Sequence, residues 1–241
     1  MSSQAADLAR CLARDAEAVC RPYLRKRGIT ALHDAPALRF HPRCYYRPDA
    51  DAPTEIWPAL IAAVTDLGGN ITGAHRTWLD PMGAGKAPID TPRRAMGHLL
   101  GHGVRLGVAT DVMAAGEGIE TMLSVRSVLR DLPMVAALSA NHLATILFGV
   151  TLRRLYVVCD DDPAGDLAAA TLTDRAQAMT NGTMQGTSPR PSTRTSSPVA
   201  TNSTPGMRRA AAASMRLICA CATGERSTKA CVIRGRITSS V

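Results

Sequence analysis

Residues 112–120 are Val-Met-Ala-Ala-Gly-Glu-Gly-Ile-Glu, and residues 155–165 are Leu-Tyr-Val-Val-Cys-Asp-Asp-Asp-Pro-Ala-Gly. In each stretch a short apolar run, typical of a buried strand, ends at a carboxylate and is followed by glycine and a helical pattern. The carboxyl ends of parallel strands meet at one edge of a sheet, where open α/β folds bind their ligands. We therefore expect Glu117, Asp160 and Asp162 to cluster there and to need a hard cation such as Mg²⁺.

Apolar strands and helical patterns alternate through the second half of the chain. Strands are predicted at 112–115, 134–138 and 154–159, and helices at about 118–130, 141–148 and 163–178. Ser139 and Asn141 are both suitable caps for the second of these helices. This alternation predicts an α/β fold with a parallel or mostly parallel sheet flanked by helices.

The region before this alternation predicts a smaller α+β unit. Residues 4–27 have helical spacing that Pro22 interrupts, so two short helices are expected rather than one. Residues 35–58 contain five prolines and predict irregular or edge-strand structure. The apolar runs 59–64 and 71–79 flank a Gly-containing turn and predict a β-hairpin.

The formal net charge of +8 is unevenly distributed along the 241 residues. Residues 1–183 hold 19 Lys and Arg and 19 Asp and Glu, whereas residues 184–241 hold nine Lys and Arg and one Glu. The positive net charge of the whole chain therefore gives little information about the folded part. The tail has 17 Ser and Thr among its 58 residues, which predicts a disordered basic segment over 184–241. Its pattern allows a short helix at about 207–220.

Other features of the composition exclude some classes of protein. No run of 18 apolar residues occurs, so no membrane partner is expected, and the first residues lack a signal-peptide pattern, which predicts the cytoplasm. The seven cysteines include no Cys-x-x-Cys pair, which favours free thiols over a zinc site. The histidines, His75 among them, also lack zinc-ligand spacing and are interpreted as ordinary surface or turn residues.

The acidic stretches resemble the Toprim domain of bacterial-type primases, topoisomerases and some nucleases. That resemblance rests on Glu117-Gly118 after one strand and on Asp160-x-Asp162 after another, 43 positions further along. It implies that Asp160 and Asp162 bind Mg²⁺ (or Mn²⁺), with Glu117 as the catalytic general base or acid and a further metal contact. Asp161 ranks below these acids. Glu120 either assists through water or is a solvated helix residue.

A simpler interpretation of one part of this pattern is also open. Carboxylates are favoured at a helix N-terminus, where they accept hydrogen bonds from free N–H groups and interact with the helix dipole. Asp160 to Asp162 could serve only to begin the following helix. That interpretation does not account for Glu117 beside three acids in succession.

The region before the acidic stretches is similar to the segments that precede the Toprim core of bacterial primases. The similarity is carried by the glycine-turn hairpin Asp66–Arg76 and by Lys86-Ala-Pro-Ile-Asp-Thr-Pro, and the chain resembles the primase-like Toprim proteins of bacterial mobile elements. It implies three segments before the tail: an N-terminal helical segment (1–34), a primase-like β-hairpin region (35–105) and a Toprim domain (106–183). The candidate phosphate contacts are Arg76, Lys86, Arg93 and Arg94.

The resemblance implies a DNA primase-like nucleotidyltransferase that uses Mg²⁺ on a DNA template in the replication of a mobile element. DNA and nucleotides are then the expected partners, with a replicative helicase as a further candidate. Two alternatives remain, a Toprim nuclease with the same acids and a catalytically inactive nucleic-acid-binding fragment. Because residues 184–241 lack the further strand of that family's domain, the resemblance also predicts an incomplete sheet.

Overall fold

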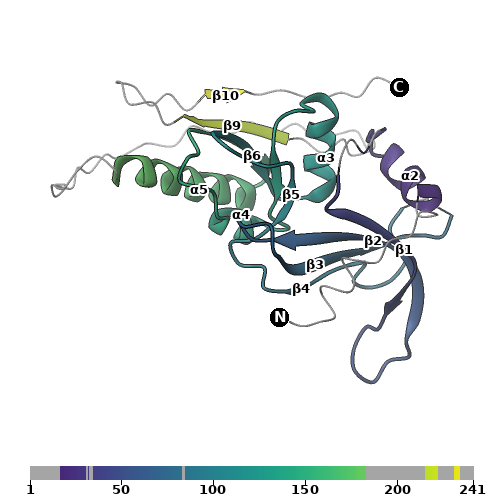
Figure 1. Cartoon of the computed structure of the whole chain (residues 1–241). Coiled ribbons are helices and arrows are strands. Elements are labelled where there is room, and N and C mark those ends of the chain that lie inside the picture. Colours follow the sequence, from purple (N-terminus) through teal and green to yellow (C-terminus); the bar gives the residue numbers. More distant parts are fainter. Residues whose placement is uncertain are drawn as a thin grey trace, which may run out of the picture.

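The computed structural model describes residues 17–30, 32, 35–82, 85–182, 215–221 and 231–233. These residues form two β-sheets with helices around the second (Figure 1). The first sheet is antiparallel and has the order β1-β2-β3-β4. Its strands are β1 (Leu38–Tyr46), β2 (Glu55–Thr65), β3 (Ile71–Trp78) and β4 (Arg93–Gly97), and helix α2 (Glu17–Arg25) precedes them.

The first sheet confirms the predicted hairpin and the predicted edge strand. Strands β2 and β3 pair antiparallel around the Gly-containing turn, and β1 lies at the edge of the sheet. The pairing of β1 with β2 shifts between His41 and Cys44, so Pro42, which has no N–H to donate, lies in that irregular stretch. Strand β4 was not predicted, because its sequence Arg-Arg-Ala-Met-Gly has little apolar alternation.

The predicted break at Pro22 is wrong. Helix α2 continues through Pro22 and ends at Arg25, so the proline lies close to the C-terminal end of the helix. A proline removes only one backbone hydrogen bond of the helix. The apolar side chains of Cys20, Tyr23 and Leu24 are buried around it, and this packing offsets the lost bond.

The second sheet is mixed and mostly parallel at its centre, as predicted. Its order is β10-β9-β8-β6-β7-β5, and β8, β6 and β7 run parallel to one another. The strands are β5 (Val104–Leu106), β6 (Val112–Gly116), β7 (Met134–Ala136), β8 (Arg154–Asp160), β9 (Met215–Cys221) and β10 (Cys231–Ile233). The outer strands β5, β9 and β10 pair antiparallel with their neighbours.

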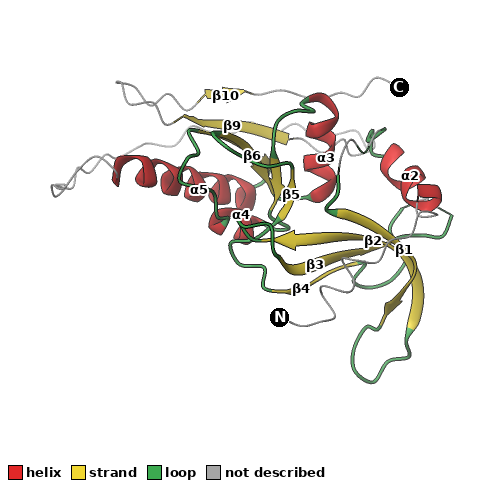
Figure 2. Ribbon diagram, viewed as in Figure 1, coloured by secondary structure: helices red, strands yellow, loops and turns green. Residues whose placement is uncertain are grey.

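Three helices flank the second sheet, where the strand–helix alternation had predicted them (Figure 2). Helices α4 (Ala140–Thr145) and α5 (Pro163–Gly182) pack over one face, and α3 (Ile119–Val128) packs over the other. Ser139, rather than Asn141, caps α4, because its hydroxyl accepts a hydrogen bond from the His142 backbone N–H at 3.2 Å.

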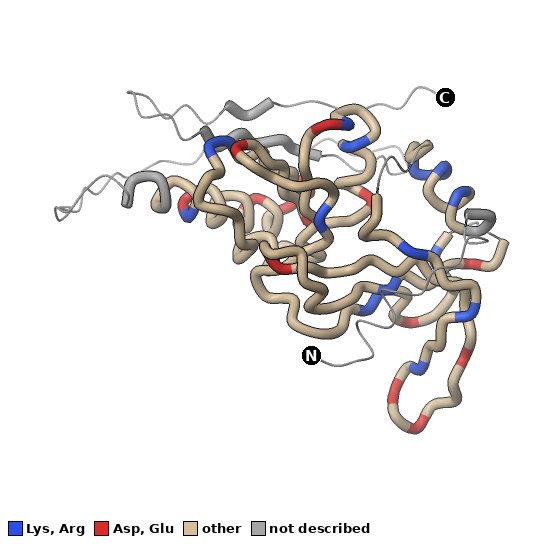
Figure 3. Tube along the Cα trace, in the orientation of Figure 1, with Lys and Arg blue, Asp and Glu red and all other residues tan. Residues whose placement is uncertain are grey.

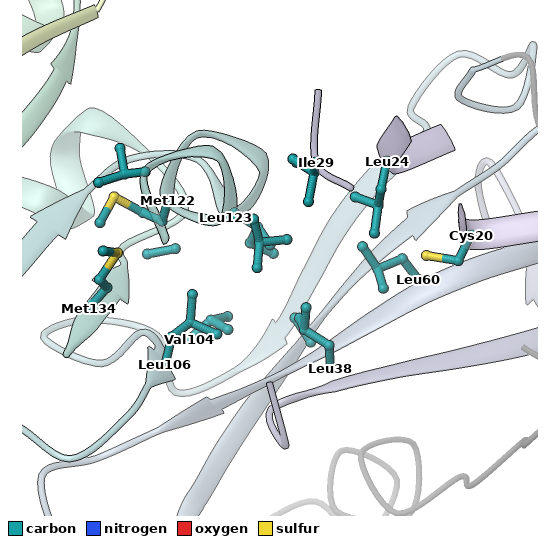
Figure 4. Packing of buried hydrophobic residues seen from close by; sticks show 14 of the residues in the cluster. Cys20, Leu24, Ile29, Leu38, Leu60, Val104, Leu106, Met122, Leu123 and Met134 are labelled. Atoms are coloured by element: carbon teal, nitrogen blue, oxygen red, sulfur yellow. The ribbon is translucent and has the colours of Figure 1, made fainter. Parts of the chain in front are cut away.

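One apolar core joins the two sheets. Leu24 of α2 and Leu60 of β2 belong to the same buried cluster as Met122 and Leu123 of α3 (Figure 4). Burying each such side chain contributes about 1.5–3 kcal/mol. The shared core therefore fixes the position of the N-terminal sheet relative to α3, which begins two residues after Glu117.

The predicted tail contributes two strands to the second sheet. Strand β9 pairs with β8 from Arg154↔Cys221 to Asp160↔Met215, so the short helix predicted at 207–220 is wrong over residues 215–220. A strand forms there because the outer edge of β8 offers unpaired backbone groups. The sheet thus continues beyond β8, where an incomplete sheet was predicted. The rest of the predicted tail, and residues 1–16 of the predicted N-terminal helices, lie outside the described residues.

Two further expectations concern the described residues alone. Among their helices, none is both long and apolar enough to cross a membrane. Cys20 is a buried free thiol, in line with the expectation for the cysteines, and Cys44 and Cys159 are also buried.

Candidate metal and nucleic-acid site

The structure places Glu117 and Asp160 at the same edge of the second sheet. Strands β6 and β8 are parallel neighbours with Gly116 opposite Val158. Glu117 directly follows β6, and Asp160 is the last residue of β8. Both carboxylates therefore leave the sheet at its carboxyl edge, where the sequence predicted them.

Asp162 begins helix α5. Its Oδ1 accepts a hydrogen bond from the Gly165 backbone N–H at 2.8 Å, and Pro163 occupies the first helical position, where its missing N–H costs nothing. The helix-capping interpretation is thus correct for one oxygen of Asp162. The other carboxylate oxygen is not needed for the cap.

Gly165 lets the beginning of α5 lie close to both strands. A Cβ atom at this position would lie 2.5 Å from the Asp160 carbonyl oxygen and 3.1 Å from Glu117 Oε1. Real Cβ atoms do not approach backbone oxygens so closely. Glycine is therefore what allows α5, the end of β8 and the Glu117 carboxylate to meet.

Glu117 carries an unpaired carboxylate oxygen. Its Oε1 is buried and has no hydrogen-bond partner in the part of the chain that the structure describes. Burial is the main cause that raises the pKa of Glu117, the negative charges of Asp160 and Asp162 raise it further, and a hydrogen bond from the Asp160 backbone opposes them. The ionised form of this carboxylate is thus disfavoured in the free protein, and a cation beside it would relieve that cost.

The backbone of Glu117 is held by a strained neighbour. Its carbonyl oxygen accepts a hydrogen bond from the Leu138 N–H at 2.7 Å, just after β7. Leu138 has φ of 81°, in the left-handed region that a residue with a branched side chain rarely adopts. Strain of this kind persists only where the surrounding structure enforces it, and it is common at functional sites.

The residues at this edge fit a magnesium ion that takes most of its ligands from elsewhere. In the part of the chain that the structure describes, no three His, Cys, Asp or Glu side chains converge to hold a metal ion by themselves. Mg²⁺ is usually bound by one or two carboxylates together with water and phosphate oxygens. The orphaned oxygen of Glu117 and the exposed carboxylate of Asp160 are hard donors of that kind.

Glu120 is partly buried and is bound by a tyrosine from the N-terminal part of the chain. The Tyr23 hydroxyl donates a hydrogen bond to Glu120 Oε1 at 2.5 Å, across 97 positions of the chain. Burial tends to raise the pKa of Glu120, but the Tyr23 hydrogen bond and the positive charges of Lys86 and Arg93 lower it overall. The solvated-helix interpretation is therefore wrong, and sequence analysis offered no local signal for Tyr23 as its partner.

Lys86 and Arg93 are two of the predicted phosphate contacts, and the positive charge of each lowers the pKa of Glu120. Arg93 pairs with Thr77, which pairs with Leu60, so Arg93 lies on the sheet face that carries the shared core. Burial lowers the pKa of Lys86, and the nearby positive charge of Arg93 lowers it further. Among the described residues, neither side chain has a hydrogen-bond or ion-pair partner.

His75 lies on the same face and was not predicted as a functional residue. It pairs with Ala62 and is buried, and its Nδ1 has no hydrogen-bond partner among the described residues. Burial lowers its pKa to about 4, Glu120 opposes that shift, and Arg93 and Lys86 add to it. The ring is therefore neutral at physiological pH, and its interpretation as a surface or turn histidine is wrong.

Arg76 and Arg94, the other two predicted phosphate contacts, pair with each other and lie on the opposite face of the sheet. The Arg76 guanidinium lies over the Trp78 ring, 4.8 Å from its centre. Arg94 donates to the carbonyl oxygens of Arg47 at 2.6 Å and of Pro48 at 2.9 Å. The structure thus brings Lys86 and Arg93 towards α3 but separates them from Arg76 and Arg94. Figure 3 shows the distribution of all Lys and Arg positions along the described chain.

Arg94→Met is expected to lower the free energy of unfolding by about 1–3 kcal/mol and to leave oligonucleotide affinity unchanged. Its guanidinium also donates to the Thr91 hydroxyl at 2.6 Å, so its loss leaves several acceptors unpaired. Urea unfolding and fluorescence anisotropy would measure the two effects. Arg43→Met, at an exposed position of β1, is the control for loss of charge. Weaker binding with unchanged stability would instead support a phosphate contact at Arg94.

Comparisons with known proteins assign both parts of the chain to families. Residues 112–184 match the family model of the Toprim domain, and residues 2–106 match a domain of unknown function, DUF7146. The comparison with curated proteins found no match. Among solved structures, the chain is similar to the crystal structure of the primase fragment of the bacteriophage T7 primase-helicase protein. That similarity has 16% sequence identity and a TM-score of 0.39, and it covers 68% of this chain and 60% of the other.

The Toprim model covers the three parallel strands β6, β7 and β8 of the mixed sheet, and with them Glu117 and Asp160 at its carboxyl edge. The antiparallel sheet and helix α2 lie within the other matched region. The chain is therefore a Toprim-domain protein with an N-terminal DUF7146 domain.

Proposed function

We propose that the protein is a Mg²⁺-dependent, primase-like nucleotidyltransferase that acts on a DNA template and nucleotides during replication of a mobile element. The observation that carries this proposal is the unpaired, buried Oε1 of Glu117 beside Asp160 at the edge of a Toprim sheet. We place the activity in the cytoplasm, with a replicative helicase as a candidate partner.

The acidic residues have distinct proposed roles. Glu117 and Asp160 would hold Mg²⁺, and the oxygen of Asp162 that does not cap α5 would support them. A bound magnesium ion would bring a phosphate group among these carboxylates and stabilise negative charge that develops on it. Glu117, whose pKa is raised by burial and by its acidic neighbours, is suited to take a proton from an attacking 3′-hydroxyl.

Lys86, in the loop after β3, and Arg93 of β4 supply the proposed phosphate contacts. The positive charges of Lys86 and Arg93 lower the pKa of Glu120, which is the second residue of α3 and follows Glu117 by three positions. Cations without ion pairs attract the backbone of DNA or the phosphates of a nucleotide. Arg76 and Arg94 are not among the proposed contacts, because their guanidinium groups already lie against an aromatic ring or donate to carbonyl oxygens.

A labelled oligonucleotide assay tests the proposal. The full chain is incubated with Mg²⁺ or Mn²⁺, nucleoside triphosphates and a labelled single-stranded template. Synthesis on the template would support the primase-like activity, degradation would indicate a Toprim nuclease, and binding without either would indicate an inactive nucleic-acid-binding protein.

Asp160→Ala is expected to lower the rate of Mg²⁺-dependent synthesis by at least about a hundredfold, because it removes a donor to the metal. Asp174→Ala, which removes an exposed carboxylate from the same α5 region, is the matched control and should retain activity. Equal activity in the wild type and in Asp160→Ala would contradict both the nucleotidyltransferase and the nuclease.

A further inference from the structure

One carboxylate at the junction of the two domains lies among several cations. Glu120 extends from α3 of the Toprim domain, and its Oε1 accepts the hydrogen bond from Tyr23 of α2. Lys86 and Arg93 come from the loop after β3 and from β4, and both act electrostatically on Glu120. Side chains from four elements of the two domains therefore surround the single negative charge of Glu120.

The positive charges at this junction outnumber the negative one. The guanidinium of Arg27 lies 4.0 Å from the centre of the Tyr23 ring, and its positive charge contributes to lowering the pKa of the half-buried Lys86. Within the described residues, Lys86 and Arg93 lack ion-pair partners at contact distance. Burial disfavours the charge of Lys86, and the positive charge of the exposed Arg93 disfavours it further, so a multiply charged anion would relieve both costs.

A buried and unpaired histidine nitrogen provides a second, independent indication of a ligand. His75 is only 9% exposed, and its Nδ1 has no hydrogen-bond partner. Buried polar atoms are nearly always paired in native proteins, so an unpaired one calls for an explanation. His75 also interacts electrostatically with Glu120, Lys86 and Arg93, so it belongs to the same cluster.

We propose that this junction binds phosphate groups, and that Glu120 is a built-in counter-ion which competes with the bound phosphate for the charges of Lys86 and Arg93. Tyr23 fixes the carboxylate in place, so Glu120 stays in the cluster when a phosphate arrives. The resulting repulsion limits the affinity and favours release of the phosphate group. This inference rests on the proposed function, because it concerns the regulation of the phosphate contacts used there.

Two sources can supply the phosphate, namely the chain of a nucleotide or the backbone of DNA. Their shared chemistry is a dense negative charge that accepts hydrogen bonds from Lys, Arg and His. Binding of inorganic tripolyphosphate and a nucleoside triphosphate would identify a nucleotide site. If the protein binds a short oligothymidylate without terminal phosphates but binds neither tripolyphosphate nor the nucleoside triphosphate, the junction is a site for the DNA backbone.

Calorimetry on the full chain, in the presence of a chelator and without divalent cations, tests the inference with these three probes. Glu120→Gln keeps the size of the side chain and an acceptor for Tyr23. It is expected to tighten binding of the phosphate probe about five- to tenfold, because it removes a nearby like charge. Lys86→Gln is expected to weaken the same binding about tenfold. Unchanged or weaker binding by Glu120→Gln, or no binding of any probe by the wild type, would overturn the proposal.

The control is Asp131→Asn, which makes the same change of net charge at an exposed position beyond the other end of α3. It should leave all three affinities unchanged, and an equal tightening there would mean that only the overall charge matters. Thermal melts would verify that each variant is folded. Because the chelator removes metal ions, this experiment can succeed even if the Mg²⁺-dependent synthesis assay fails. The failures of the two proposals are thus separable.

Discussion

Glu117→Gln is expected to abolish Mg²⁺-dependent synthesis and, at the same time, to stabilise the fold. Removing a general base typically lowers the rate about 10²–10⁴-fold, and loss of a metal donor adds to this effect. The gain in stability arises because the buried Oε1 of Glu117 has no partner, and because Asp160 and Asp162 repel its charge. A neutral amide avoids the repulsion.

The stabilising effect has a defined pH dependence. Burial first, and then Asp160 and Asp162, raise the pKa of Glu117 in the folded state above its unfolded value. The contribution of this carboxyl to stability is therefore fully present below its unfolded pKa and is lost as the pH rises through the folded pKa. Glu117→Gln does not titrate, so its advantage over the wild type should grow across that window and then level off.

Urea unfolding at several pH values, without divalent cations, would measure the difference between the wild type and Glu117→Gln. Asp174→Asn, which neutralises an exposed carboxylate on α5, should show no comparable gain. Addition of Mg²⁺ should stabilise the wild type more than Glu117→Gln, because ligand binding to the folded state stabilises it. A variant that retains synthesis, or a stability difference that is independent of pH, would contradict the role assigned to Glu117.

Gly165→Ala is expected to lower the free energy of unfolding by about 3 kcal/mol and to remove the activity. The added Cβ would lie 2.5 Å from the Asp160 carbonyl oxygen. That oxygen cannot easily move, because Asp160 belongs to β8, which is paired on both sides by β6 and β9. The beginning of α5 would have to shift instead, and with it the Asp162 cap and the space around Glu117 Oε1.

Gly149→Ala is the matched control for this substitution, because a Cβ there would meet only the Thr151 hydroxyl at 3.7 Å. Urea unfolding and the template assay, applied to both variants, would separate the effect of the close approach from that of any alanine in place of glycine. If Gly165→Ala keeps wild-type stability and activity, then α5 can shift away from β8 without disturbing the site.

Several features could be predicted from the sequence because they depend on local chemistry. The apolar runs before Glu117 and Asp160 predict strands, and glycine and a helical pattern after each carboxylate predict a strand-to-helix turn. The Gly-containing turn predicted the β2–β3 hairpin for the same reason. The Asp162-Pro163 pair also has the composition of a helix start, and one oxygen of Asp162 does cap α5.

Other features depended on which surfaces meet in three dimensions. Strand β4 has little apolar pattern, so the separation of Arg93 from Arg94 onto opposite faces became visible only once its pairing with β3 was known. Strand β9 forms in a polar tail because β8 offers an open edge. In both cases the partner strand, rather than the sequence itself, supplies the hydrogen bonds that define the element.

The sequence by itself determined the strand–helix order and the carboxylates that end two parallel strands, since periodicity and turn residues encode these locally. Only the tertiary structure decided the surroundings of Glu120, whose partner Tyr23 lies 97 positions away. The same holds for His75, which is buried on the face of the first sheet that carries the shared core. A local pattern specifies which face of an element is apolar, but the charges that face a given carboxylate depend on the packing of distant segments.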